Sequence, residues 1–195
     1  MIRSADLIAL HDGLAARPAG RLGEPIEANH RHNQALWKEE DLARRRNVSD
    51  AEIVANKRAI DFNNQKRNDA IEQIDELILQ SLQSVKVAPG ARLSSETAGA
   101  MTDRLSILSL KIRAMREQTE RSDVDGAHVD ACLQRLARLI AQRDDLAACL
   151  DCLLTEAARG ETYFKVYRQH KMYNDPKLNP ALYGEMRGET GSQDA

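Results

Sequence analysis

The chain has 195 residues, a length that suits one well-buried core rather than two. Hydrophobic residues make up 42% and charged residues 30%, and 28 basic against 30 acidic side chains give a formal net charge of -2. Because charges of both signs are mixed along the chain, the composition excludes a strong overall field that would attract nucleic acid or an anionic membrane.

The first 25 residues predict no targeting or membrane-spanning segment. The apolar run from Leu7 to Leu10 is too short for the core of a signal peptide, and nothing elsewhere approaches the roughly 20 apolar residues of a spanning helix. We therefore expect a cytoplasmic protein without membrane insertion, with no more than a short helix near its N-terminus.

Hydrophobic periodicity predicts four long helices after this segment. Pro25 suits the start of a first helix that runs to about Arg46. Ser49 and Glu52 form a capping-box pattern, which predicts that a second helix begins there and covers residues 51–85.

The third and fourth long helices follow after shorter connections. The second helix is expected to stop at Pro89, and either Ser94 or Ser95 could cap the third. The third helix is apolar on most sides, so it should be the most buried. A turn at residues 122–126 should precede the fourth helix, which is expected to end at Gly160.

These patterns predict an all-α fold. No stretch alternates apolar and polar residues, so no strand is expected, and short connections favour a bundle of four long antiparallel helices. We expect one helical domain over residues 1–186, with the core bundle at 25–160, an irregular or helical packing segment at 161–186, and a flexible tail at 187–195. The packing segment holds five of the chain's seven aromatic residues, which is unusual for a disordered tail.

Polar residues interrupt the apolar seams of the second and fourth helices. Lys57, Asn64 and Arg67 lie in the seam of the second helix, and Arg143 lies near the centre of the fourth. At about 100° per residue, both arginines fall within roughly 30° of the axis of their apolar stripe. Polar groups in a helical core are costly, so they should be satisfied by partners or used for binding.

The second and fourth helices also resemble each other weakly. A shift of 76 residues pairs Arg67 with Arg143 and Asp75 with Asp151. Two hairpins related by pseudo-symmetry would place both arginines at one level of the bundle, but chance similarity between amphipathic helices explains the pairing equally well.

The polar positions predict an anion-binding site in the bundle interior. The planar guanidinium of Arg67 suits a carboxylate or phosphate, and Arg104 and Lys111 flank the apolar stripe of the third helix. Cations without equal acids nearby would form an anion pocket, whereas equal acids would form a structural network. The predicted ligand-binding residues are Lys57, Asp61, Asn64, Gln65, Arg67, Asn68, Arg104, Lys111 and Arg143.

Acidic residues provide candidates for catalysis. Glu40 lies on the inward face of the first helix, where it could form a structural salt bridge with Arg67 or belong to the ligand site. Glu40, Asp41 and Glu72 are the candidate catalytic acids.

A magnesium site is a weaker hypothesis. Glu72 and Asp75 on one helix, with Glu39 and Glu40 on another, are similar to the acidic arrangement by which all-helical nucleotide pyrophosphatases hold Mg²⁺. Ala43 stands where a second acid of the first helix would be expected. We therefore expect no cofactor, with magnesium as the alternative.

Four stretches of the sequence resemble the bacterial protein family named domain of unknown function 4254. They are NQALWKEEDLARR at 33–45, KRAIDFNNQKRNDAIEQID at 57–75, ETAGAMTDRLSILSLKI at 96–112 and KMYNDPKLNPALY at 171–183. The resemblance implies an all-helical protein and brings no established activity. Members often accompany cell-envelope glycosyltransferases, which implies a sugar-polymer context.

The resemblance also marks individual positions. The matching positions are Trp37, Asp41, Lys57, Asp61, Asn64, Gln65, Arg67, Asn68, Glu96, Asp103, Arg104, Lys111, Tyr173, Asn174 and Asp175. Ala98 departs from the family pattern, which would have proline in the E-T-x-G turn. This departure could loosen the start of the third helix, but Glu96 and Gly99 are in place.

The sequence thus predicts a soluble helical-bundle protein that binds a phosphate or carboxylate ligand, such as a sugar nucleotide or phosphosugar. A link to cell-envelope glycan synthesis is implied by the resemblance alone. Two alternatives are a non-catalytic adaptor or oligomerisation partner of a glycosyltransferase, and a magnesium-dependent nucleotide hydrolase. The expected partners are a small anionic or sugar-related ligand and a second copy or protein partner, but not nucleic acid. Whether the protein is an enzyme stays open.

Overall fold

The computed structural model describes residues 2–15, 17–18, 20–169 and 177–178. The elements in chain order are α1 (Ser4–His11), α2 (Gly23–Leu42), α3 (Asp50–Ser81), β1 (Arg92–Leu93), α4 (Ala98–Thr119), α5 (Gly126–Arg159) and β2 (Thr162–Tyr163). The predicted helical fold is confirmed, including the short N-terminal helix. Among the helices of the described residues, none has a stretch long and apolar enough to span a bilayer.

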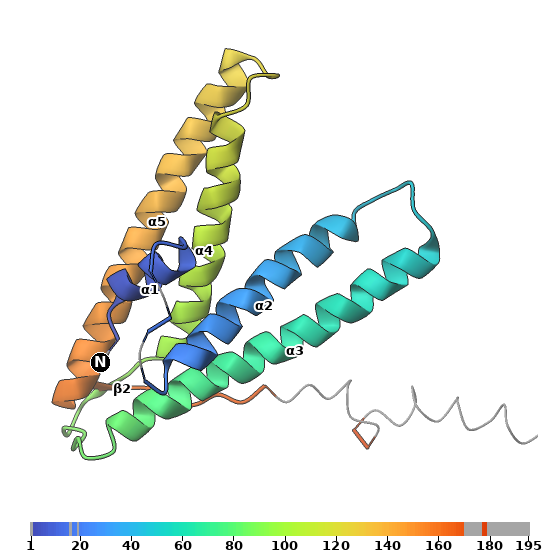
Figure 1. Ribbon diagram of the computed structural model, residues 1–195. Helices are drawn as coiled ribbons and strands as arrows, with labels where there is room; N and C mark the ends of the chain where they lie inside the picture. The colour runs from blue at the N-terminus through green and yellow to red at the C-terminus, as the bar shows by residue number, and fades with distance from the viewer. Residues whose placement is uncertain (1, 16, 19, 170–176, 179–195) are drawn as a thin grey trace, which may run out of the picture.

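The four long helices form two antiparallel hairpins, α2 with α3 and α4 with α5 (Figure 1). The hairpins meet at one end and diverge toward their loops, which we call the tips. Helix α4 makes the contacts to α2 and α3, whereas α5 packs against α4, α1 and β2. The expected single four-helix bundle is therefore not confirmed, because the second hairpin contacts the first mainly through α4.

The hydrophobic core lies where the two hairpins meet. The core residues are Leu7, Ile26, Ile74, Ile78, Ala98, Met101, Leu105, Leu146, Ala147, Leu150, Leu153, Leu154 and Phe164. They come from the beginnings of α2 and α4, the ends of α3 and α5, and the segments beside them. Toward the tips the facing surfaces still carry apolar side chains, including Trp37, Met115 and Leu139, but these side chains line an open cleft instead of packing together.

Local sequence signals place several helix ends as predicted. The side chain of Ser49 accepts a hydrogen bond from the backbone N–H of Glu52, and the Glu52 carboxylate accepts one from the Ser49 N–H at 3.1 Å. Asp125 caps α5 within the predicted turn at 122–126. Gly160 ends α5 with a φ of 75°, a left-handed conformation that favours glycine.

The predicted cap of α4 is wrong. Thr97, rather than Ser94 or Ser95, caps this helix, because its side chain accepts a hydrogen bond from the Ala100 N–H at 3.2 Å. The Ser94 hydroxyl instead donates to the carbonyl oxygen of Glu96 at 2.8 Å. Several Ser and Thr residues precede α4, so local spacing alone did not identify the one that adopts the cap conformation.

A short parallel strand pair was not predicted. Arg92 aligns with Thr162, and Leu93 aligns with Tyr163. Two residues per strand are too few for an alternating pattern to appear in the sequence. The pair joins the chain after α5 to the segment before α4.

The segment after α5 packs on the fold as far as the structure describes it. Phe164 is 3% exposed and belongs to the core, and Arg168 pairs with Glu72 at 3.0 Å. Most of the predicted packing segment at 161–186 lies outside the described residues, so its far boundary stays a prediction.

Candidate functional site

A buried polar network lies where α2, α3 and α4 meet. Asp103 on α4 is 7% exposed, and its Oδ1 accepts hydrogen bonds from Nδ2 of Asn29 and of Asn33, each at 2.9 Å. Nε of Arg67 lies 3.9 Å from the same oxygen. Two amides and one guanidinium therefore compensate the buried carboxylate.

The network continues along α4 to Ser106. Oγ of Ser106 accepts a hydrogen bond from Asn33 at 3.0 Å and lies 2.8 Å from Nδ1 of His30. Nε2 of Gln34 lies 3.0 Å from Nε2 of His30, and an amide nitrogen only donates, so the His30 ring accepts there and carries its proton on Nδ1. Burial, with the charge of Arg113, lowers the pKa of His30, which favours this neutral ring.

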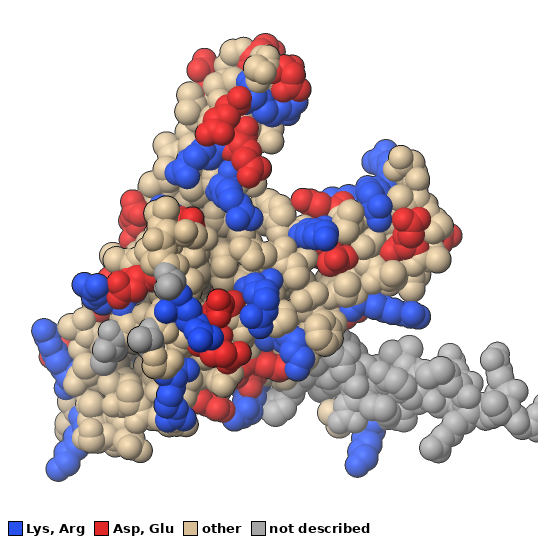
Figure 2. All heavy atoms as spheres, viewed as in Figure 1, with Lys and Arg blue, Asp and Glu red and all other residues tan. Residues whose placement is uncertain are grey.

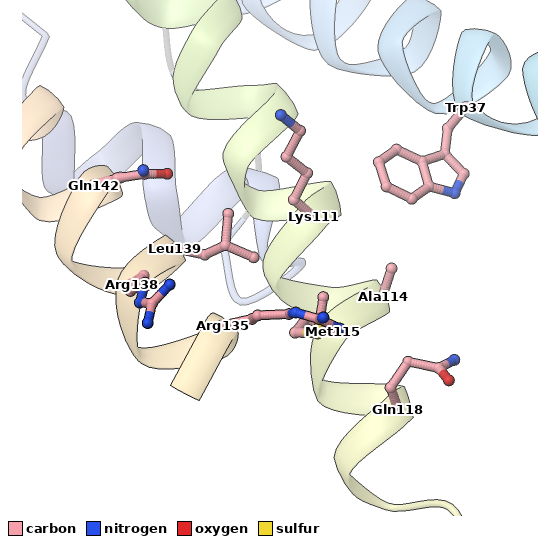
Figure 3. A pocket seen from close by; sticks show the side chains of 9 residues that line it. All are labelled: Trp37, Lys111, Ala114, Met115, Gln118, Arg135, Arg138, Leu139 and Gln142. Carbon is pink, nitrogen blue, oxygen red and sulfur yellow. The ribbon is translucent and has the colours of Figure 1, made fainter. Parts of the chain in front are cut away.

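A cleft runs between the two hairpins on another side of α4. Its central part, about 500 Å³, is lined by Trp37 of α2 and by side chains of α4 and α5 (Figure 3). Adjoining hollows share Trp37 and Lys111 with it, so the lining is continuous along α4. Figure 2 shows the notch between the hairpins, with charged side chains of both signs along its edges.

The central cleft has a one-sided charge. It is lined by three cations, Lys111, Arg135 and Arg138, and by no carboxylate. Within the described residues, none of the three takes part in an ion pair. Trp37, the chain's only tryptophan, is 38% exposed and faces α4 across the cleft (Figure 3).

The adjoining hollow of about 420 Å³ brings two predicted catalytic acids next to Arg67. Both acids form ion pairs with Arg44, which lies 3.3 Å from Glu40 and 3.6 Å from Asp41. The predicted pair between Glu40 and Arg67 is not among the described ion pairs, because Arg67 lies toward Asp103 instead.

On the other side of the central cleft, a hollow of about 630 Å³ contains two of the predicted ligand-binding cations, Arg104 and Lys111. Arg104 pairs with Glu96, whereas Lys111 belongs to the central cleft as well. Asp145 adds an acid to this hollow. The positive charge is therefore concentrated in the central cleft.

Much of the predicted polar block on α3 lies away from the cleft. Lys57 and Asp61 form an exposed pair one turn apart, and Gln65 donates to Asp69 at 2.8 Å. Asn64 is half-buried. Neither side-chain pair lines the described hollows, so these residues are not brought together with Arg104 and Lys111.

The two seam arginines each have an aspartate partner from another element. Nη1 of Arg143 lies 2.8 Å from Asp12, and the Arg143 side chain is 13% exposed. Arg67 is 26% exposed beside Asp103, and the hollow that it lines does not include Arg143. These ion pairs match the predicted structural alternative, but among the described residues Nε of both arginines is buried without a hydrogen-bond partner. Asn68, the remaining predicted residue of the block, donates to Gln169.

One pairing suggested by the weak repeat has a structural counterpart. Asp75 accepts a hydrogen bond from the Gly99 N–H at 2.6 Å, at the start of α4. Asp151 accepts from the Ser4 N–H at 2.9 Å and from the Ser4 hydroxyl at 2.6 Å, at the start of α1. Both aspartates thus hold the N-terminus of a neighbouring helix.

The magnesium hypothesis gains no support from the acids that suggested it. Glu72 pairs with Arg168, while Asp75 is buried against Gly99. Burial raises the pKa of Asp75 to about 6, although hydrogen bonds from Thr97 and Gly99 oppose the shift. Among the described residues, no group of three or more His, Cys, Asp or Glu side chains is placed to hold a metal ion.

Sequence reasoning did not include Arg135 and Arg138 among the ligand-binding residues. They recur with Gln142 on one polar face of α5, a spacing that usually means a solvated surface. Only the divergence of the hairpins turns this face into a cleft wall. Trp37 is among the positions that carry the family resemblance, but the polar residues in the helix seams do not point to it.

Comparison with known proteins assigns the chain to a family but gives no further relative. No match was found among curated proteins or among solved structures. The family profile described as "Protein of unknown function (DUF4254)" matches residues 24–166, which contain α2 to α5 and the cleft between the hairpins. Tyr173, Asn174 and Asp175 fall beyond that match and outside the described residues. The chain belongs to this family of proteins of unknown function.

Proposed function

We propose that the protein binds a small phosphate-bearing molecule, of the sugar-nucleotide or phosphosugar type, in the central cleft between its hairpins. The observation that carries the proposal is the set of cations Lys111, Arg135 and Arg138 in a cleft without a lining carboxylate. A phosphate there would form charge-assisted hydrogen bonds without displacing a resident acid.

The rest of the lining suits a ring attached to the phosphate. Trp37 offers a flat apolar surface beside the cations, and stacking of a base on an aromatic side chain contributes about 1–3 kcal/mol. Gln118 and Gln142 provide amide groups that can bind hydroxyls. The volume of about 500 Å³ lies within the usual range for small-molecule sites.

Several positions that carry the family resemblance lie along the same surface. Trp37, Asp41, Arg67, Arg104 and Lys111 line the central cleft or its adjoining hollows, although they come from three different helices. Their convergence supports the cleft as the binding site. The link to cell-envelope glycans rests on the family resemblance, and we propose it only in that sense.

The geometry favours binding over turnover. The central cleft has no carboxylate or histidine among its lining residues, and Glu40 and Asp41 in the adjoining hollow are both paired with Arg44. A catalytic role for either acid would require the ligand to displace Arg44.

Calorimetric titration of the full chain tests the proposal, with UDP-glucose and uridine as the two probes. We expect UDP-glucose to bind and uridine to bind at least roughly tenfold more weakly, because uridine lacks the phosphates. Arg135→Gln combined with Arg138→Gln should weaken UDP-glucose binding by a similar factor.

The control variant removes the same charge from the opposite side of α4. Arg113→Gln combined with Arg116→Gln should leave the affinity for UDP-glucose nearly unchanged, since neither residue lines the cleft. No binding of UDP-glucose, or equal losses in the two variants, would show that the cleft is not a phosphate site.

A second candidate is a helical adaptor that associates with another copy or protein through α3. Val54 and Phe62 are 48% and 60% exposed on the part of α3 toward the tip. A contiguous apolar patch marks an interaction surface whereas single exposed apolar side chains are common, so these two residues indicate only where such a contact would lie. Light scattering tests this alternative: a discrete oligomer that Phe62→Glu converts to a monomer would favour it, and a monomeric wild-type chain would count against self-association.

A further inference from the structure

The hollow of about 420 Å³ that adjoins the central cleft lies between α2, α3 and α4. Trp37 lines both the central cleft and this hollow, so the two spaces meet at its ring. Leu36, Ile107 and Leu110 make one part of the wall apolar. A molecule held by the cations of the central cleft has room to extend past Trp37 into this hollow.

Asn33 presents an unpartnered acceptor to the hollow. The residue is 4% exposed, and its Nδ2 donates to Asp103 at 2.9 Å and to Ser106 at 3.0 Å. Among the described residues no donor lies within hydrogen-bond distance of its Oδ1, and this oxygen is not one of the unpartnered atoms that are closed off from solvent. Because Nδ2 is directed at Asp103 and Ser106, Oδ1 is the polar atom of Asn33 that is left for the hollow.

Arg67 presents donors beside this acceptor. Its side chain is 26% exposed, and its Nε lies 3.9 Å from the same Asp103 oxygen that Asn33 contacts. Nε is closed off from solvent, but Nη1 and Nη2 are not, and neither forms a hydrogen bond or ion pair with the described residues. Asp103 thus holds an amide acceptor and a guanidinium donor next to each other, as a binding site requires.

Two carboxylates complete the polar lining. Glu40 and Asp41 each pair with Arg44 through one oxygen, Oε2 of Glu40 at 3.3 Å and Oδ1 of Asp41 at 3.6 Å. A carboxylate accepts several hydrogen bonds, so the second oxygen of each acid is available without displacement of Arg44. An anionic group would meet two negative charges here, unlike in the central cleft, so the lining suits neutral hydroxyl groups.

We propose that this hollow binds the sugar ring of a ligand whose phosphate lies in the central cleft, an assignment that rests on the proposed function. Neighbouring hydroxyls of the ring accept hydrogen bonds from Nη1 and Nη2 of Arg67 and donate to Oδ1 of Asn33. A further hydroxyl donates to the second oxygen of Glu40 or Asp41, and the apolar face of the ring packs against Trp37.

The mixture of donors and acceptors selects for hydroxyls. A hydroxyl both donates and accepts, whereas an ammonium group only donates and a carboxylate only accepts. A site built to bind hydroxyls discriminates against a ligand that lacks them, because its own polar groups are then left unpaired. The hollow should therefore favour a ligand with a sugar over one of equal charge without it.

The test compares UDP-glucose with the methyl ester of UDP, which has the same charge but a methyl group in place of the sugar. Calorimetric titration of the full chain should show that UDP-glucose binds at least roughly tenfold more tightly than the ester. Glu40→Ala combined with Asp41→Ala should remove most of this preference. Arg67→Lys keeps a positive charge beside Asp103 but lacks the planar fork, so it should reduce the preference as well.

The control variant removes two acids from α2 outside the cleft and its hollows. Glu24→Ala combined with Glu27→Ala should leave the preference for UDP-glucose unchanged, since both residues are exposed and neither lines these spaces. Measuring the two ligands on each variant cancels the general effect of charge on phosphate binding, because both ligands carry the same charge.

The outcomes separate the sugar assignment from the phosphate site. Equal affinities for UDP-glucose and the methyl ester in the wild-type chain would overturn the sugar assignment but leave the phosphate site in place, because both ligands would still bind. Binding of neither ligand would overturn the phosphate site and the sugar assignment with it. A preference that survives in both the Glu40, Asp41 variant and Arg67→Lys, or that falls equally in the Glu24, Glu27 control, would also overturn the sugar assignment.

Discussion

His11 and Asp75 are buried ionisable residues whose effects on stability oppose each other. Burial lowers the pKa of His11 from 6.5 to about 3, so within this window only the unfolded chain binds the proton, and stability falls as the pH drops. Burial raises the pKa of Asp75 from 3.8 to about 6, so Asp75 stays protonated to a higher pH in the folded chain than in the unfolded chain. The stabilisation that follows from this shift is fully present below pH 3.8 and is lost as the pH rises through about 6.

Asp75→Asn should therefore change the pH dependence of the free energy of unfolding. Relative to wild type, this variant should gain stability between about pH 4 and about pH 7, by up to roughly 3 kcal/mol, because one pKa unit corresponds to about 1.4 kcal/mol. Urea denaturation at several pH values measures the difference. His11→Phe is the control of opposite sign and should gain relative stability as the pH falls. Curves that run parallel to that of the wild type would contradict both assignments.

Gly99 and Gly126 are both near the start of a helix but differ in their surroundings. A Cβ atom at Gly99 would lie 2.4 Å from the carbonyl oxygen of Ile71, so α3 and α4 would have to separate. We expect Gly99→Ala to lower the free energy of unfolding by roughly 1–3 kcal/mol, as overpacking does. A Cβ at Gly126 meets nothing within 4 Å, so Gly126→Ala should be neutral or stabilising by up to about 1 kcal/mol. Denaturant unfolding should distinguish the two, and equal effects would refute this account of the contact.

Individual elements are attached to the hairpins by single polar contacts as well as by apolar packing. Asp151 on α5 holds the first turn of α1 through both the backbone and the hydroxyl of Ser4. Asp151→Ala should remove this attachment and cost about 0.5–2 kcal/mol, as the loss of a helix cap does. Hydrogen exchange should become faster in α1 and stay unchanged in α3, and unchanged protection of α1 would show that packing alone holds it.

The elements themselves could largely be predicted from the sequence, because their signals are local. The capping box at Ser49 and the left-handed Gly160 both act over a few residues. The partners of the seam arginines could not be predicted in the same way. Arg143 meets Asp12, which lies 131 positions away in the chain, and no helical periodicity encodes that contact.

At the scale of the whole molecule, the divergence of the hairpins was the main feature that the sequence did not predict. Four amphipathic helices with these apolar stripes suit a closed bundle, but the structure limits the core to one end. The same divergence determines the candidate site, since it leaves an open cleft between Trp37 and the face of α5 that carries the exposed side chains of Arg135 and Arg138. Although the net charge is only -2, the cleft lining concentrates positive charge.

Trp37 allows the most direct measurement of the central claim, because it is the only tryptophan and forms part of the cleft wall. Its fluorescence should change saturably when UDP-glucose is titrated into the wild-type chain and into the Arg113→Gln, Arg116→Gln variant. The change should be lost, or shifted to much higher ligand concentration, in the Arg135→Gln, Arg138→Gln variant. Trp37 emission that does not respond to UDP-glucose, or that responds equally in both variants, would contradict the cleft between the hairpins as the phosphate-binding site.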